Sequence, residues 1–226
     1  MNHNDVLLIL GAADTAAKWH AGQRRKGAAG EPYLNHLVEV AAMVAEATDG
    51  RDPELVAAAL LHDAIEDQPI TRDMIAERFG EDVASLVVEC TDDKSLPYEE
   101  RKRLQIALAP YKSPRAQVIK LADKTSNLIS MVESPPAGWS TLRRAKYIVW
   151  SRHVVRALGG GMSRELQIKF WEASNRAEKV VVTEHYAAPL EQARLQSQAL
   201  QQQREAAVRR REQSPLRLVL NDPQDS

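Results

Sequence analysis

The chain has 226 residues, with 30 basic and 31 acidic side chains and a formal net charge of −1. This length suits one domain with a full hydrophobic core and an appendage, and 44% hydrophobic with 27% charged residues is ordinary for a globular protein. The balanced charge gives no global attraction to nucleic acid or to a membrane surface, so phosphate recognition would need a local cluster. We therefore expect no DNA, RNA or membrane partner, and the sequence leaves a homo-oligomer open.

Cysteine usage and the first residues indicate the compartment. The single cysteine, Cys90, excludes an internal disulfide and a thiolate metal cluster, and its apolar neighbours favour a buried, inert thiol. Near the start, the apolar run from Val6 to Leu10 is short, follows Asp5 and has no basic leader. This pattern is typical of neither a secretory signal nor a membrane span, so we expect a cytoplasmic protein.

Helical periodicity runs through the chain without a convincing pair of alternating strands, which predicts an all-α fold. Asp52 followed by Pro53 is typical of a helix start, with an N-cap and then proline at the first helical position. The expected helices cover residues 4–20, 82–91 and 163–186, begin near residues 31–33, 53, 71, 97 and 114, and include a long helix that ends near 158.

The composition changes at about residue 187. Residues 187–226 are rich in Gln and Arg and have few large apolar side chains and no clean heptad. We expect a C-terminal helical or disordered extension there, and a core domain over residues 1–186.

The most informative segment is residues 60–67, which read Leu-Leu-His-Asp-Ala-Ile-Glu-Asp after a run that is apolar from Leu55. On one continuous helix, His62 and Glu66 lie four residues apart on one face, and so do Asp63 and Asp67. Buried carboxylates without partners are costly, so a positive group must compensate them, and a metal ion is the simplest candidate.

Two further positions extend this candidate metal site. His36 begins an otherwise apolar helical face, where simple packing is the alternative, and Asp123 interrupts an apolar stripe, where a buried salt bridge is the alternative. With His62 and Asp63 they give two imidazoles and two carboxylates from three helices, which suits Mn²⁺, Fe²⁺ or Zn²⁺ better than Ca²⁺. An octahedral ion with four protein ligands keeps room for water and a substrate oxygen, as in a metal-dependent hydrolase.

These four residues resemble the H…HD…D pattern of the HD superfamily of metal-dependent phosphohydrolases. Over residues 4–185 the chain is similar to the hydrolase domain of RelA/SpoT-type alarmone enzymes. The matching segments, in chain order, are residues 25–36, 59–67, 79–80, 91–94, 101–103 and 120–128. Because only residues 187–226 follow, we expect a stand-alone small alarmone hydrolase, similar to metazoan SpoT homologues.

The resemblance implies an all-α HD-domain helical bundle that removes pyrophosphate from the ribose 3′ position of ppGpp or pppGpp, with one Mn²⁺ ion held by the four ligands. It implies that Glu66 and Asp67 orient or deprotonate water and assist protonation of the leaving group. The residues it matches to substrate contacts are Arg25, Lys26, Asn127, Arg143 and Tyr147. Spacing alone would also allow a solvated helix end at the two acids and a solvated basic loop at Arg25.

Two other functions stay open from the sequence. One is an HD phosphohydrolase of other nucleotides, such as (p)ppApp or NADPH, and the other is a catalytically silent module that binds a nucleotide or a partner. The chain also departs from its relatives at Tyr98, where the family often has a lysine. If that lysine binds diphosphate, affinity or substrate choice differs here.

Overall fold

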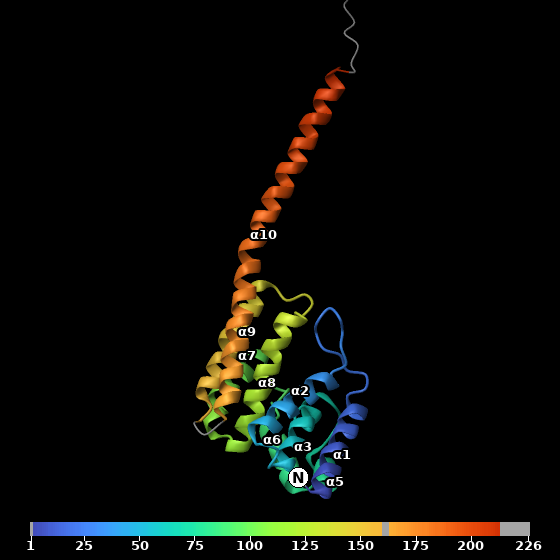
Figure 1. Cartoon of the computed structure of the whole chain (residues 1–226), viewed down its shortest axis with the longest axis vertical. Helices are drawn as coiled ribbons and strands as arrows, with labels where there is room; N and C mark the ends of the chain where they lie inside the picture. Colours follow the sequence, from blue (N-terminus) through green and yellow to red (C-terminus); the bar gives the residue numbers. More distant parts are fainter. Residues whose placement is uncertain (1, 160–162, 213–226) are drawn as a thin grey trace, which may run out of the picture. The chain divides into compact units, whose positions relative to one another are not determined.

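The computed structural model describes residues 2–159 and 163–212, and this part of the chain is built from helices (Figure 1). The helices are α1 (His3–Trp19), α2 (Leu34–Ala47), α3 (Pro53–Leu61), α4 (Ala64–Asp67), α5 (Arg72–Phe79), α6 (Glu81–Cys90), α7 (Tyr98–Leu108), the short 3₁₀ helix η1 (Ala109–Tyr111), α8 (Pro114–Glu133), α9 (Thr141–Ala157) and α10 (Arg164–Glu212). Extended pairing within the described ranges is limited to two isolated bridges. The all-α prediction is confirmed.

Side-chain caps fix several helix starts. The carboxylate of Asp52 accepts from the amide of Leu55 at 3.0 Å, and Pro53 is the first residue of α3. Ser113 and Ser140 cap α8 and α9 in the same way. Each cap satisfies an amide that the helix itself leaves without a partner, so the start predicted at Asp52 is confirmed for a local physical reason.

The core surrounds α3, in which every residue from Leu55 to Leu61 is buried. α3 packs against α1, α2 and α6, while α8 packs against α2, α6 and α9. Cys90 is buried at the end of α6, and burial raises the pKa of its thiol to about 11, which accords with an inert thiol.

The single helix expected through residues 60–67 is wrong. α3 ends at Leu61 and α4 begins at Ala64, so His62 and Asp63 form the turn between them. The imidazole Nδ1 of His62 lies 2.8 Å from the carbonyl of Ala59, the group to which the amide of Asp63 would bond in a continuing helix. The imidazole competes with the backbone amide for that carbonyl, and the break separates buried His62 and half-buried Asp63 from the two acids that follow.

The chain divides into two compact units, residues 1–182 and 183–226. In the second unit, the described residues form the C-terminal part of α10, where Leu195 and Leu200 are each 57% exposed. An exposed helix is what the sequence favours for this segment, while residues 213–226 of the expected extension lie outside the described residues. The boundary at residue 186 stays a prediction. None of the described helices is long and apolar enough to span a membrane.

Candidate metal centre and nucleotide pocket

Two buried histidines and an aspartate meet between α2, α3 and α8. His36, His62 and Asp123 each offer a ligand atom, and these atoms lie within 4.8 Å of one another. Both imidazoles are 2% exposed, and the Nε2 atom of each is buried without a hydrogen-bond partner. Buried polar atoms are almost always paired, so two such nitrogens facing a carboxylate fit the ligand set of a divalent cation.

Asp63 stands beside this group. Its Oδ2 atom lies 3.2 Å from Nε2 of His62 and 3.8 Å from Nε2 of His36, and it accepts a hydrogen bond of 2.5 Å from the hydroxyl of Tyr33. The structure therefore brings together all four residues expected as metal ligands. The turn that breaks the helix after Leu61 lets consecutive residues, His62 and Asp63, both face the same point.

The second nitrogen of each imidazole is held by a neighbour. Nδ1 of His62 donates to the carbonyl of Ala59 at 2.8 Å. Nδ1 of His36 lies 2.8 Å from the hydroxyl of Ser126, which itself donates to Glu39 at 2.6 Å. Because that hydroxyl proton is engaged by Glu39, Ser126 accepts from His36. Both rings thus carry a proton on Nδ1 and aim Nε2 at the centre, where a bound cation would take the place of any proton on that atom.

Electrostatics keep the carboxylates of the centre ionised. Burial raises the pKa of Asp63, but the charge of His62 outweighs burial and holds that pKa well below its usual range. Burial also raises the pKa of Asp123, and there the charge of Lys124, at 2.7 Å, holds the pKa well below its usual range. Burial lowers the pKa of His62, yet the charge of Asp63 outweighs it and the net value is about 9. For His36 burial dominates and the pKa is lowered. Cation binding would displace a proton from His62.

Glu66 and Asp67 line a cavity of about 340 Å³ beside this centre. Glu66 accepts from the amide of Asp92 at 3.2 Å and lies 3.9 Å from Arg101, and burial, followed by the charges of Asp63 and Asp92, raises its pKa. Asp67 accepts from Gln23 at 2.7 Å and is paired with Lys94. Both acids are therefore oriented by neighbours, unlike the side chains of a solvated helix end.

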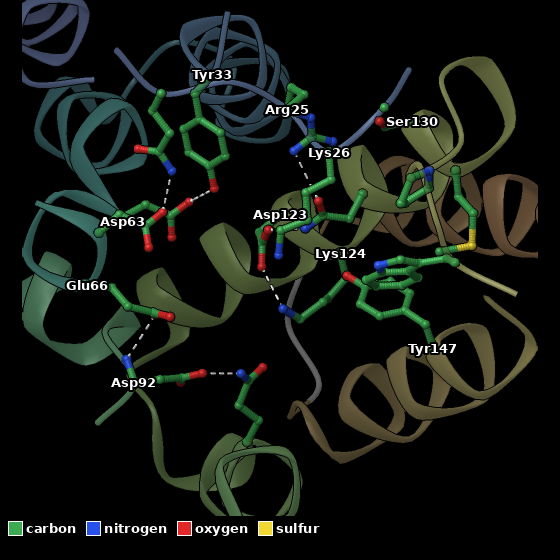
Figure 2. Close-up of a pocket in the computed structure, with 18 of the residues that line it drawn as sticks. Arg25, Lys26, Tyr33, Asp63, Glu66, Asp92, Asp123, Lys124, Ser130 and Tyr147 are labelled. Atoms are coloured by element: carbon green, nitrogen blue, oxygen red, sulfur yellow. Dashed lines mark hydrogen bonds and ion pairs between the residues drawn. The ribbon is translucent and has the colours of Figure 1, made fainter. Parts of the chain in front are cut away.

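The opposite side of the cavity is basic and aromatic (Figure 2). Arg25 donates to Asn127 at 3.2 Å, and Asn127 donates to Asp123 at 2.6 Å, which links the basic loop to the metal centre. Lys26 and Tyr147 line the same cavity, and burial raises the pKa of Tyr147 to about 12. Figure 2 shows Asp123 between the acidic side, with Asp63 and Glu66, and the side that carries Arg25, Lys26 and Tyr147.

Arg143 is the one expected substrate contact that does not line this cavity. It lines a neighbouring hollow of about 420 Å³, and its guanidinium lies 4.3 Å from the ring centroid of Trp139. The two cavities share Tyr98, Lys102, Trp139 and Tyr147.

A glycine holds the basic loop against the segment that follows α8. The amide of Ala137 donates to the carbonyl of Lys26 at 2.7 Å, and a Cβ on Gly27 would lie 2.0 Å from Oγ of Ser134. No side chain fits at that approach, so glycine is required there. The contact fixes the backbone next to Arg25 and Lys26.

Several residues of the site were not singled out by sequence reasoning. The long-range partners are Tyr33, which binds Asp63; Ser126 and Glu39, which hold His36; Gln23, which binds Asp67; and Asp92 and Arg101, which hold Glu66. Tyr33, Asp92, Arg101 and Ser126 lie inside the segments that resemble the alarmone hydrolases, which is the only signal that could have indicated them.

Comparison with known proteins shows the family of the chain. Residues 12–153 match the family model described as HD domain. The guanosine-3′,5′-bis(diphosphate) 3′-pyrophosphohydrolase MESH1 of Homo sapiens is 45% identical over 164 residues, covering 73% of this chain and 91% of that protein. The enzyme of the same name from Drosophila melanogaster is 43% identical over 157 residues, covering 70% and 87%.

A solved structure gives the same result. A metazoan orthologue of SpoT, described as hydrolysing ppGpp, superposes with a TM-score of 0.71 at 40% identity, covering 75% of this chain and 94% of the other. The chain belongs to the HD domain family.

Proposed function

We propose that this protein is a Mn²⁺-dependent hydrolase that converts ppGpp or pppGpp to GDP or GTP and pyrophosphate. The observation that carries the proposal is the pair of buried Nε2 atoms of His36 and His62, which face Asp63 and Asp123 at the edge of a cavity with a basic far side. The names of the relatives in the preceding comparison support the choice of substrate.

The four ligands, His36, His62, Asp63 and Asp123, would hold one Mn²⁺ ion. When bound, the ion supplies Lewis-acid polarisation of the phosphoryl group and a water of lowered pKa. Mixed imidazole and carboxylate ligands suit Mn²⁺, and the Nδ1 contacts of both histidines keep their donor atoms aimed at it.

The chain's own residues complete the reaction. Water adds to the phosphorus attached to the ribose 3′ oxygen, the bond between them breaks, and that oxygen takes a proton. Glu66 accepts the proton of the water, because burial raises its pKa toward the range of a useful base. Asp67, fixed by Gln23, assists proton delivery to the leaving oxygen.

The basic and polar side of the cavity would bind the substrate. Arg25 forks onto phosphate or stacks on the purine, and Lys26 adds a point charge. Asn127, four residues after Asp123 on α8, reaches the ribose or base, and Tyr147 bounds the cavity next to Arg143 in the adjoining hollow.

We also propose that residues 1–186 are sufficient for catalysis, since every group named above lies within them, and that the enzyme works in the cytoplasm. A buried free thiol as the single cysteine suits a reducing compartment.

Incubating the purified protein with ppGpp and Mn²⁺ tests the proposal. We expect equal amounts of GDP and pyrophosphate, and no products when EDTA is present. Intact ppGpp despite bound Mn²⁺ would contradict the substrate, and parallel reactions with pppApp and NADPH would then show whether another nucleotide is hydrolysed.

A further inference from the structure

The side chain of Lys102, on α7, ends inside a box of three aromatic rings. Its Nζ atom lies 3.1 Å from the ring centroid of Trp150, 4.9 Å from that of Tyr147 and 5.4 Å from that of Tyr98. The indole N–H of Trp150 donates to the backbone carbonyl of Lys102 at 3.0 Å. This hydrogen bond fixes the nearest of the three rings relative to Lys102. The box is therefore a built feature of α7 and α9.

In the part of the chain that the structure describes, no carboxylate lies within ion-pair distance of the Lys102 amine. Within the described ranges Lys102 makes no ion pair or hydrogen bond through Nζ, whereas Lys124, 4.9 Å from the same Trp150 ring, is paired with Asp123 at 2.7 Å. Aromatic faces attract a cation but offset only part of the cost of removing it from water. Burial, followed by the charge of Lys124, lowers the pKa of Lys102 to about 6.

The position of Lys102 connects it to the substrate. It lines both the catalytic cavity and the neighbouring hollow, and it comes from a different element than the loop that carries Arg25 and Lys26. A bis-phosphorylated nucleotide carries negative charge at two separated places, so its pocket needs positive charge in more than one wall. Lys102 is thus a basic group of that pocket which forms no ion pair in the described part of the chain, although the charges of Asp123 and Asp92 act on it from a distance.

We propose that Lys102 is a substrate-binding residue whose ammonium, presented by the box of Tyr98, Tyr147 and Trp150, pairs with a phosphate group of the bound nucleotide. The inference rests on the proposed function for the identity of that nucleotide. The phosphate is either part of the 3′-diphosphate that is cleaved or part of the 5′-phosphates that remain on the product, and the two products distinguish these sources.

Three variants test the role of Lys102. Lys102→Met removes the charge but keeps the length, Lys102→Arg keeps the charge, and Arg103→Met removes a charge from the next residue, which is exposed and paired with Glu100. We expect Lys102→Met to raise KM for ppGpp about tenfold, the usual scale for loss of a hydrogen bond to a charged group, with a smaller change in kcat. Lys102→Arg restores most of the affinity, and Arg103→Met leaves KM unchanged.

Thermal unfolding separates binding from a structural role. Because Met suits an aromatic box better than an unpaired ammonium does, Lys102→Met should unfold at the same or a higher temperature. A lower unfolding temperature with unchanged KM would overturn the proposal and make Lys102 a packing residue.

Product binding identifies the phosphate. Weaker binding of GDP by Lys102→Met, with pyrophosphate unaffected, assigns Lys102 to the 5′-phosphates, and the reverse assigns it to the 3′-diphosphate. If neither product nor ppGpp binds more weakly, the proposal is wrong. Should wild-type protein fail to hydrolyse ppGpp, the proposed function fails, but calorimetric binding of these ligands still tests Lys102.

Discussion

Replacing Ser126 by alanine tests how the metal centre is built. The hydroxyl of Ser126 is fully buried, accepts from Nδ1 of His36 at 2.8 Å and donates to Glu39 at 2.6 Å. Ser126→Ala leaves the Nδ1 proton of His36 buried without a partner and frees the ring to turn or to change tautomer. Loss of such a contact to a metal-ligating imidazole typically lowers metal affinity about 10- to 100-fold, so we expect Mn²⁺ binding to weaken by about 1.4–2.7 kcal/mol.

Competition with a chromophoric chelator at fixed pH measures that affinity. Thr125→Val is a matched control, because Thr125 is also fully buried on α8 and its hydroxyl donates to the carbonyl of Leu121 at 2.8 Å, away from the ligands. We expect the control to lower stability without changing Mn²⁺ affinity. Equal Mn²⁺ affinity in Ser126→Ala and wild type would refute the inference that Ser126 orients His36.

Four further results are expected. Glu66→Gln should lower kcat by about 10²- to 10⁴-fold while Mn²⁺ binds normally, as expected when a proton acceptor is lost. In the wild type kcat should fall as the pH drops through the raised pKa of Glu66, since a base is inactive once protonated; a pH–rate profile without an acidic limb would contradict this role. The affinity for ppGpp should fall as the pH rises above about 6, because Lys102, which faces Lys124, Asp123 and Asp92, then loses its proton before substrate binds, and Lys102→Arg should lack this decline. A chain that ends at Ala187 should keep the kcat and KM of the full protein in the same assay, and loss of activity would place a needed group in the extension.

Local patterns predicted most of the helices. Asp52 and Pro53 mark the start of α3, because capping and the fixed φ of proline act within a few residues of the chain. The apolar run from Leu55 to Leu61 indicated a buried helix for the same kind of reason, since burial follows from composition alone when every position is apolar.

The helix break at His62 and Asp63 could not be read in that way. It depends on the imidazole bonding back to the carbonyl of Ala59 and on Tyr33, thirty residues earlier, binding Asp63. The first contact competes with a helix hydrogen bond of similar strength, and the second exists only once α2 and α3 have packed. The hydrophobic periodicity of the sequence carries no information about either contact.

The candidate metal ligands could be predicted from the sequence, whereas the residues that hold them in place could not. Histidine and aspartate inside apolar runs are unusual enough to stand out at His36, His62 and Asp123. Ser126 and Lys102 have no such contrast with their neighbours. Their importance comes from what faces them in space, an imidazole in one case and three aromatic rings in the other.

The most direct test of the metal-centre account is to titrate Mn²⁺ into metal-free protein while recording the bound ion and the rate of pyrophosphate release from ppGpp together, in the wild type and in Asp63→Ala. The account predicts that activity rises in proportion to one ion per chain and that Asp63→Ala, still folded by circular dichroism, shows neither tight binding nor release. Pyrophosphate release before any ion is bound, or undiminished release by Asp63→Ala, would contradict it.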